Sequence, residues 1–136
     1  MTGSGKCLCG SVKITAGNVS ENLGACHCTM CRKWTGSPWF ATDCGTDVQF
    51  EGQENISSYA SSDWAERAFC NKCGTHLFYK LKLKDKPQYM VSVGILDNIT
   101  SYNFDHQIFI DEKPEYYSFA NQTHNMTGAE VFAKFA

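Results

Sequence analysis

The sequence predicts a mostly β fold, built from short antiparallel strands with little helix. Several short segments alternate β-branched or aromatic residues with small or charged ones, a period of two that is typical of half-buried strands. Glycines punctuate these segments, and helical periodicity is weak. No repeat and no linker rich in proline, glycine or serine divides the chain. We therefore expect a single domain over residues 1–136.

The strand alternation is clearest in three segments: residues 11–16, 47–51 and 88–93. In the second segment Val48 and Phe50 alternate with polar neighbours, so one side of the strand is apolar. Glycines follow or flank each segment and end it. Helix is expected only as two short turns, at residues 29–34 and 128–135.

Seven of the eight cysteines fall into three tight clusters, which are Cys7 and Cys9, then Cys26, Cys28 and Cys31, then Cys70 and Cys73. The C-x2-C spacing is typical of zinc knuckles, and pairing it with a second cluster strengthens the prediction. Disulfides are the alternative. Eight cysteines in 136 residues lie below the roughly 8–10% of a disulfide scaffold, and cysteines one residue apart are poor partners for each other.

Ligand counting suggests how the clusters divide. Structural zinc is almost always held by four protein ligands, whereas catalytic zinc keeps three and leaves one position exchangeable. The working division gives Cys7, Cys9, Cys70 and Cys73 to a structural site and Cys26, Cys28 and Cys31 to an open one. The spacing alone does not prove this division. Tetrahedral sulfur also suits iron at the four-cysteine site, although we expect zinc.

Charge and hydropathy narrow the class of protein. The formal net charge of −2 gives no general attraction to nucleic acid. No run of about 18 apolar residues predicts a membrane-spanning helix, and the first six residues lack the apolar stretch of a secretory signal. Seven metal-binding thiols suit a reducing compartment, so we expect a cytoplasmic protein. From its charge and hydropathy we expect it to bind neither membrane nor nucleic acid.

The motifs together resemble the glutathione-dependent formaldehyde-activating enzyme family, which includes centromere protein V. The resemblance is carried by residues 6–10, 26–33, 36–38, 69–75, 93–97 and 105–114. It implies a β-rich, tent-like domain stabilised by zinc, with two zinc ions per chain. By that likeness the four-cysteine group holds the structural ion and the three-cysteine group the catalytic ion.

The family reaction implied by this likeness joins glutathione and formaldehyde into S-(hydroxymethyl)glutathione; in reverse it is a carbon–sulfur lyase step. The charge of the three-cysteine site agrees with the binding of a thiol substrate. Three thiolates leave a zinc centre with net charge −1, which suits a fourth sulfur better than the activation of water. The expected partner is thus a small thiol such as glutathione.

Two cations, Arg32 and Lys33, directly follow the third cysteine of the middle cluster. They could offset its negative charge and bind a substrate carboxylate, or they could be solvated turn residues. We take them as candidate substrate-binding residues.

The other candidate residues are weaker. His27 lies between two ligands and is expected to face away from the metal, because alternate side chains of an extended segment point to opposite sides. His76 is a candidate fourth ligand or proton-transfer group, or an ordinary strand residue. Cys44 is expected to be a small buried hydrophobe, although it would close the three-cysteine site if it joined it. The spacing assigns no role to His106 or His124.

A second class of function is compatible with the same residues. The chain could be a non-catalytic zinc module that presents a surface to a protein partner. Such a module is expected to carry a basic tail or a large apolar patch, and the sequence has no charge block. The enzyme hypothesis is therefore preferred, while the exact thiol, the electrophile and the oligomeric state are not set by the sequence.

Overall fold

The computed structural model describes residues 1–82, 85–97 and 101–134. The chain forms two compact units that are interleaved in sequence. The first unit comprises Met1–Glu21 and Thr42–Ser101, and the second comprises Asn22–Ala41 and Tyr102–Ala136.

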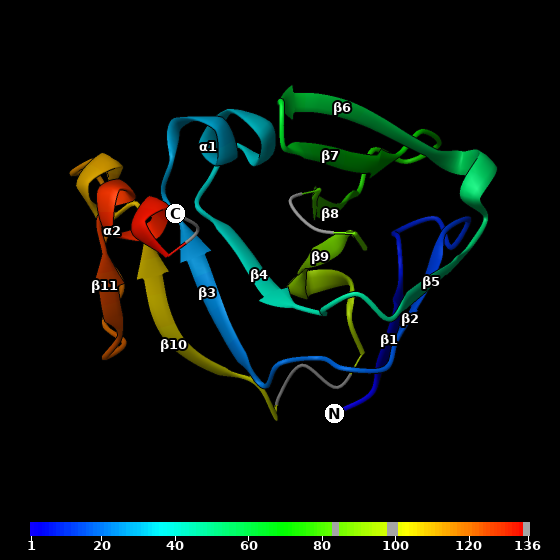
Figure 1. Cartoon of the computed structure of the whole chain (residues 1–136), viewed down its shortest axis with the longest axis horizontal. Helices are drawn as coiled ribbons and strands as arrows, with labels where there is room; N and C mark the ends of the chain where they lie inside the picture. The colour runs from blue at the N-terminus through cyan, green and yellow to red at the C-terminus, as the bar shows by residue number, and fades with distance from the viewer. Residues whose placement is uncertain (83–84, 98–100, 135–136) are drawn as a thin grey trace. The chain divides into compact units, whose positions relative to one another are not determined.

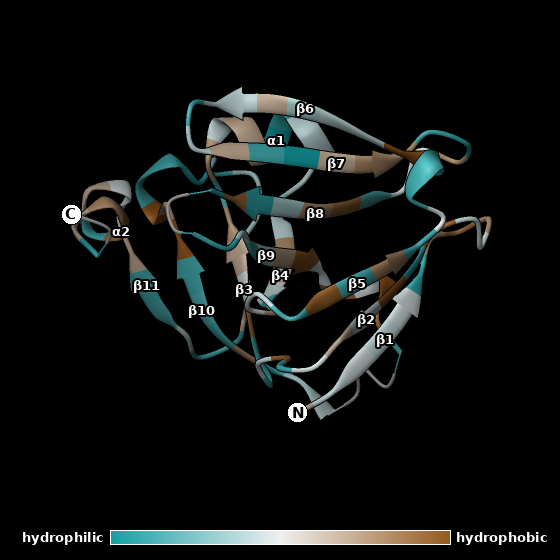
Figure 2. Cartoon of the chain, turned by 45° about the vertical axis from the view of Figure 1, so that its right-hand side comes forward, coloured by the Kyte–Doolittle hydropathy of each residue, from teal (hydrophilic) through white to brown (hydrophobic). Residues whose placement is uncertain are grey.

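The first unit begins with a three-stranded antiparallel sheet, in the order β1 (Gly3–Lys6), β2 (Lys13–Ala16) and β5 (Val48–Glu51). Hydrophobic and hydrophilic residues alternate along β5 (Figure 2). Ile14 on β2 is opposite Phe50 on β5, and Ile14 is buried. The apolar side of this small sheet therefore faces the core of the unit.

Four further strands of the first unit follow one another as antiparallel neighbours: β6 (Ile56–Ser62), β7 (Ala65–Cys70), β8 (His76–Leu81) and β9 (Gln88–Ser92). They lie side by side in Figure 1. Short 3-10 turns, η1 (Gln53–Asn55) and η2 (Val93–Ile95), flank them. The rings of Phe50, Phe78 and Tyr89 pack with centroids 4.9–5.5 Å apart, which joins β5 to this layer.

The second unit has the strand order β11 (His124–Met126), β10 (Asn103–Ile108), β3 (Asn22–Cys26) and β4 (Trp39–Asp43), the last two residues of β4 belonging to the first unit. Its helices are α1 (Thr29–Thr35), the 3-10 turn η4 (Ile110–Glu112) and α2 (Gly128–Ala133). In Figure 1 α1 follows the carboxyl end of β3. Phe40, Phe104 and Phe119 form an edge-to-face cluster with centroids 5.3–5.4 Å apart.

The mostly β prediction is confirmed. The three expected strands appear as β2, β5 and β9, each within the expected segment, and the two expected helical turns are α1 and α2. Phe135, the last residue of the second expected turn, lies outside the described residues. The expected antiparallel pairing holds in the first unit, but β10 runs parallel to both β3 and β11. Long connections between these strands permit parallel pairing, which a hairpin does not.

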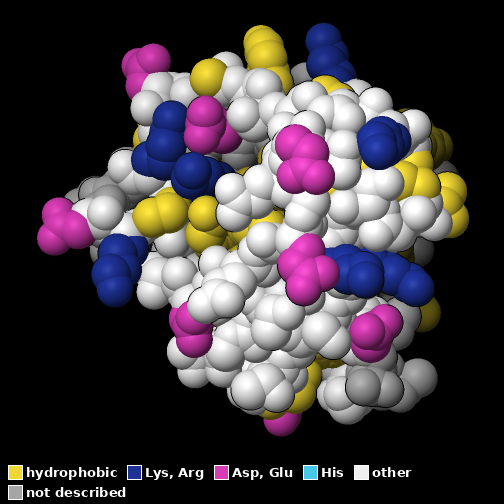
Figure 3. Space-filling view, turned by 90° about the vertical axis from the view of Figure 1, so that its right-hand side faces the viewer, with side chains coloured by type: hydrophobic (Ala, Val, Ile, Leu, Met, Phe, Trp, Pro, Cys, Tyr) yellow, Lys and Arg dark blue, Asp and Glu magenta, His cyan; other side chains and the backbone are white. Residues whose placement is uncertain are grey.

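Two surface properties bear on function. Positive and negative side chains are interspersed on the face shown in Figure 3, in keeping with the small net charge. In the part of the chain that the structure describes, no helix is long and apolar enough to cross a membrane.

Gly5 on β1 supports a testable prediction about packing. It forms an isolated bridge with Leu96, and a Cβ at Gly5 would lie 2.0 Å from the carbonyl oxygen of Ile95. Because the obstacle is backbone, the Gly5→Ala substitution should lower the free energy of unfolding by about 2 kcal/mol. Gly94→Ala is the matched control, since a Cβ there meets no atom within 4 Å. Urea unfolding of both variants tests this, and equal midpoints would contradict it.

Candidate metal centres

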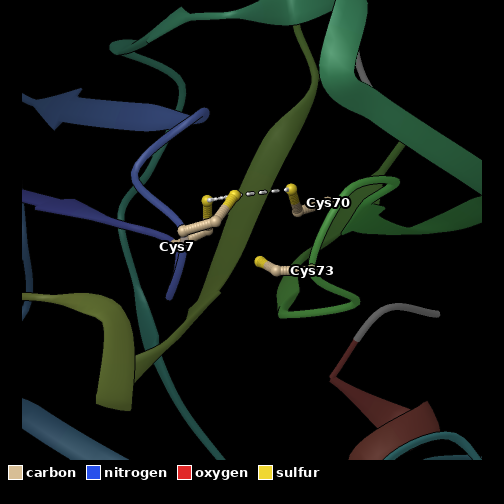
Figure 4. A group of neighbouring side chains, drawn as sticks. Cys7, Cys70 and Cys73 are labelled. Atoms are coloured by element: carbon tan, nitrogen blue, oxygen red, sulfur yellow. Dashed lines mark hydrogen bonds between the residues drawn. The ribbon is translucent and has the colours of Figure 1, made fainter.

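Four cysteine thiols gather in the first unit. Cys7 and Cys9 lie in the loop after β1, Cys70 ends β7, and Cys73 lies in the turn before β8. Their sulfur atoms lie within 4.8 Å of one another, and those of Cys7, Cys70 and Cys73 converge in Figure 4. Cys9 Sγ is 3.6 Å from Cys7 Sγ and 3.8 Å from Cys70 Sγ.

These sulfur separations fit one tetrahedral ion. A zinc–sulfur bond of about 2.3 Å requires tetrahedral S···S edges of about 3.8 Å. A disulfide requires about 2.05 Å between its sulfur atoms. All eight cysteines are free. The chemistry of the donor set therefore suits zinc better than a covalent bridge.

The two loops that supply the four thiols share one local construction. Gly10 and Gly74 both have a φ of +79°, a left-handed conformation that favours glycine. Gly10 N donates to Cys7 O at 3.0 Å, and Gly74 N donates to Cys70 O at 2.8 Å. Each glycine thus closes a tight turn that lets both of its cysteines join the four-thiol group, and this explains the glycine after each of these cysteine pairs.

Hydroxyl groups next to the thiols change their ionisation. The hydrogen bond with Ser11, whose Oγ is 3.2 Å from Cys9 Sγ, lowers the pKa of Cys9. The hydrogen bond with Thr75, whose Oγ1 is 3.1 Å from Cys73 Sγ, lowers the pKa of Cys73 to about 5. Burial instead raises the pKa of Cys70. The group thus combines two thiols whose pKa is lowered, Cys9 and Cys73, with the buried thiol of Cys70, whose pKa is raised.

The second unit brings together the other three thiols. Cys26 ends β3, Cys28 is the N-cap of α1, and Cys31 lies one turn into that helix. Their sulfur atoms lie within 4.8 Å of one another, and all three residues are buried. Cys31 N donates to Cys28 Sγ at 3.3 Å. Contact with the thiols of Cys28 and Cys31, together with burial, raises the pKa of Cys26, so a compensating cation is needed for all three to be thiolates.

Neighbouring side chains hold the loop that carries these three thiols. Glu112 Oε1 accepts hydrogen bonds of 3.0 Å from both the backbone N and the Oγ1 of Thr29, at the first turn of α1. Arg32 Nε donates to His27 O at 2.9 Å. Arg32 therefore braces the loop, and Lys33 is exposed at the end of the helix. Their expected role in substrate binding stays a prediction.

His27 faces away from the three thiols, as its position between two cysteines predicted. It is fully buried, with Nε2 2.8 Å from Gln107 Oε1 and Nδ1 2.7 Å from Tyr117 OH. Gln107 Nε2 donates to Thr123 Oγ1 at 2.8 Å, and Thr123 donates to Asn125 Oδ1 at 2.6 Å.

The direction of this network follows from its fixed donors and acceptors. Since the amide nitrogen of Gln107 donates to Thr123, its oxygen accepts from His27 Nε2. Burial lowers the pKa of His27, so the ring is neutral and its Nδ1 accepts from the Tyr117 hydroxyl. The chain of bonds therefore fixes the backbone between Cys26 and Cys28 from the side opposite to their thiols.

The remaining candidates have separate environments. Cys44 is fully buried, burial raises its pKa to about 12, and its backbone N donates to Tyr89 O. This confirms the expectation that it is a small buried residue. His76 begins β8 in the first unit, where burial lowers its pKa, and it does not belong to the four-thiol group of that unit's described residues.

Comparisons with known proteins find similarity over most of this chain. Residues 2–112 match the family described as glutathione-dependent formaldehyde-activating enzyme. The chain belongs to this family. The match begins before the first cysteine cluster and ends after β10, so it includes all three clusters.

Similar chains occur in fungi and bacteria. A protein of Schizosaccharomyces pombe, named as an uncharacterized lyase, is 39% identical over 127 residues, which cover 93% of this chain and 92% of that protein. An Aspergillus flavus protein, provisionally named as a glutathione-dependent formaldehyde-activating enzyme, is 34% identical over 89 residues, 57% of this chain and 43% of that protein. The crystal structure of a Rhodobacter sphaeroides protein superposes with a TM-score of 0.59 at 27% identity, covering 70% of this chain and 88% of that one.

Three residues that support the site were not predicted from the sequence, and all three lie after the last cysteine cluster. Gln107, Glu112 and Tyr117 hold the three-thiol loop, although the segment from 105 to 114 carried only the resemblance and no assigned role. No spacing rule could identify them, because they contact the loop from positions 80 or more residues away. The parallel pairing of β10 with β3 places Gln107 there, and Glu112 and Tyr117 follow β10 in the chain.

Tyr117 tests the network around His27. Tyr117→Phe keeps the ring that stacks on His27, with centroids 5.5 Å apart, but removes the donor to its Nδ1. The free energy of unfolding should fall by about 1–2 kcal/mol, because a buried acceptor loses its partner. Tyr116→Phe is the control, since Tyr116 is 79% exposed, and it should change stability by less than about 0.5 kcal/mol. Equal stability of both variants in urea unfolding would contradict the network.

Proposed function

We propose that this chain is a zinc-dependent carbon–sulfur lyase that interconverts a thiol–aldehyde adduct and its two components. The proposed adduct is S-(hydroxymethyl)glutathione or that of a similar small thiol. The observation that carries the proposal is the group of three buried thiols, those of Cys26, Cys28 and Cys31, in a member of this family. Names of similar proteins as a lyase and as a formaldehyde-activating enzyme support it.

Two zinc ions per chain, one at each thiol group, are part of this proposal. The four thiols of the first group could supply all four ligands of a tetrahedral ion, which is the ligand number of a structural site. Three thiols leave one coordination position for an exchangeable ligand, which is the arrangement of a catalytic site. We assign the structural ion to the first unit and the catalytic ion to the second.

The charge of the three-thiol group indicates what its ion is for. When bound there, zinc would carry a net charge of −1 with its thiolates and would favour the thiolate form of an incoming thiol over the activation of water. The chain's own residues supply the rest of the site. Arg32 and Lys33 follow Cys31 directly and would bind the carboxylates of glutathione while Arg32 Nε stays on His27 O.

The proposal treats residues 1–136 as one functional domain in the cytoplasm. The family match runs from residue 2 to residue 112 and includes sequence from both compact units, which supports one functional domain. The reducing environment of the cytoplasm keeps free thiols available for metal, and all eight cysteines here are free.

Metal analysis tests the two-site assignment. The parent protein should bind two zinc ions per chain. Cys28→Ser should remain folded and bind one, because the first unit keeps its four thiols, whereas Cys70→Ser should also lower the melting temperature by weakening a structural site. Cys44→Ala is the control, since Cys44 lies outside the four-thiol group of its unit, and it should keep both ions. Inductively coupled plasma mass spectrometry gives the counts. One ion in both parent and Cys28→Ser would refute the open site and favour a non-catalytic zinc module.

Exchange spectroscopy by NMR tests the activity. The zinc-loaded parent should accelerate the exchange between formaldehyde and S-(hydroxymethyl)glutathione above the spontaneous rate. Cys28→Ser should lose this acceleration, because one of the three thiols is gone, and Cys44→Ala should keep it. Replacing glutathione by cysteine or N-acetylcysteine in the same assay defines the thiol. Spontaneous rates for every thiol would contradict the proposed function.

A further inference from the structure

The imidazole of His106 lies across a glycine beside the three-thiol group. Strands β10 and β3 lie side by side (Figure 1), and His106 on β10 is the cross-strand partner of Gly24 on β3. A Cβ built on Gly24 would lie 2.1 Å from His106 Nε2 and 2.3 Å from its Cδ2. The space of a side chain on β3 is therefore taken by the tip of the imidazole, and only glycine permits this.

A β-bulge pairs the same imidazole with a carboxylate. Leu23 is opposite Phe104 and Gly24 is opposite His106, so Asp105 is an extra residue in β10. Consecutive side chains of a regular strand point to opposite faces, and a bulge relaxes this rule. Asp105 Oδ1 consequently reaches His106 Nδ1 at 2.6 Å. Because a carboxylate only accepts, Nδ1 carries a proton, and in the neutral form of the ring the lone pair is therefore on Nε2, over Gly24.

Stability does not explain this pair. The side chains of His106 and Asp105 are 35% and 38% exposed, and such an exposed pair contributes only about 0–1 kcal/mol even when both groups are charged. The bulge and the glycine instead share one effect, which is to fix where Nε2 points. Bulges are common beside active sites for this reason.

Nε2 lies on the face of β3 that carries the first thiol of the group. Cys26 follows Gly24 by two residues, so its side chain points to the side where the ring lies. At about 3.3 Å per residue, the two positions are about 7 Å apart along the strand. A small carbonyl compound that reacts there would have to lie between the imidazole and a sulfur held at the three-thiol group.

We propose that His106 transfers the proton in the thiol–aldehyde reaction and that Asp105 positions its ring. This inference rests on the proposed function. In the forward direction Nε2 accepts the proton of the thiol. The sulfur then forms a bond to the carbonyl carbon, the π electron pair moves to oxygen, and Nε2 returns the proton to that oxygen. The reverse sequence breaks the carbon–sulfur bond, so the reaction balances without another reactant.

Matched substitutions test the proton transfer. His106→Gln should lower kcat of the zinc-loaded protein by roughly 100-fold, the usual scale of general acid–base catalysis, and leave the zinc content at two ions. His124→Gln is the control, because His124 is the exposed cross-strand partner of His106 on β11, one strand further from β3. If the parent is active and His106→Gln has the same kcat, the proton-transfer role is wrong while the proposed function still stands.

Chemical rescue separates catalysis from structural support. The rate of His106→Ala should recover when imidazole is added, and the recovered rate should vary with the basicity of substituted imidazoles. Asp105→Asn should lower kcat but leave KM unchanged, because the amide no longer fixes the proton on Nδ1. Rescue that is independent of basicity would mean that the ring only fills space, and the inference would then be wrong.

Cobalt measures the proximity independently of activity. In the cobalt-loaded protein the ring protons of His106 should show paramagnetic broadening that is lost in Cys26→Ser, and those of His124 should broaden less. Absence of broadening at His106 would overturn the inference whatever the activity. The ring protons of His106 could broaden in a parent that does not accelerate the exchange of formaldehyde with its thiol adduct. In that case the proposed function is wrong, and the proton-transfer role is wrong with it.

Discussion

The close packing of cysteine thiols constrains this structure more than any other interaction. In the first unit it joins a loop near the amino terminus to a turn 61 positions further along the chain, where Cys9 and Cys70 meet at 3.8 Å. Neutral thiols attract one another weakly, so their convergence requires another source of free energy. A metal ion would provide one, because its binding energy becomes folding energy when the site is assembled from distant segments.

The second group of thiols is built differently. Its three cysteines span six consecutive positions, so their proximity is largely local and depends on the start of α1 after β3. Distant residues do not supply thiols here; they hold the loop. Glu112 secures the first turn of the helix, and the bonds from Tyr117 to Asn125 secure the backbone through His27. Local cysteines thus supply the thiols and distant residues hold the loop, which suits a site whose geometry must persist while one ligand exchanges.

Parallel pairing of β10 with β3 connects these supports to one another. The same strand places Gln107 on the face of His27 and His106 on the face of Cys26, because successive residues point to opposite sides. One strand thus braces the thiol loop from behind and presents the proposed proton-transfer group, His106, in front. The bulge at Asp105 makes the second role possible by bringing two consecutive polar side chains together.

The sequence by itself determined the mostly β fold class and the positions of three strands, and it suggested the two sets of thiols. These depend on local signals: alternation along Val48 and Phe50, the glycine after each cysteine pair of the first group, and the number of ligands that zinc accepts. Only the tertiary structure decided the parallel strands, the fixed tautomer of His27 and the position of His106 over Gly24. The reason is that each depends on the register between β3 and β10, and that register is set by contacts between segments about 80 residues apart, which no local pattern encodes.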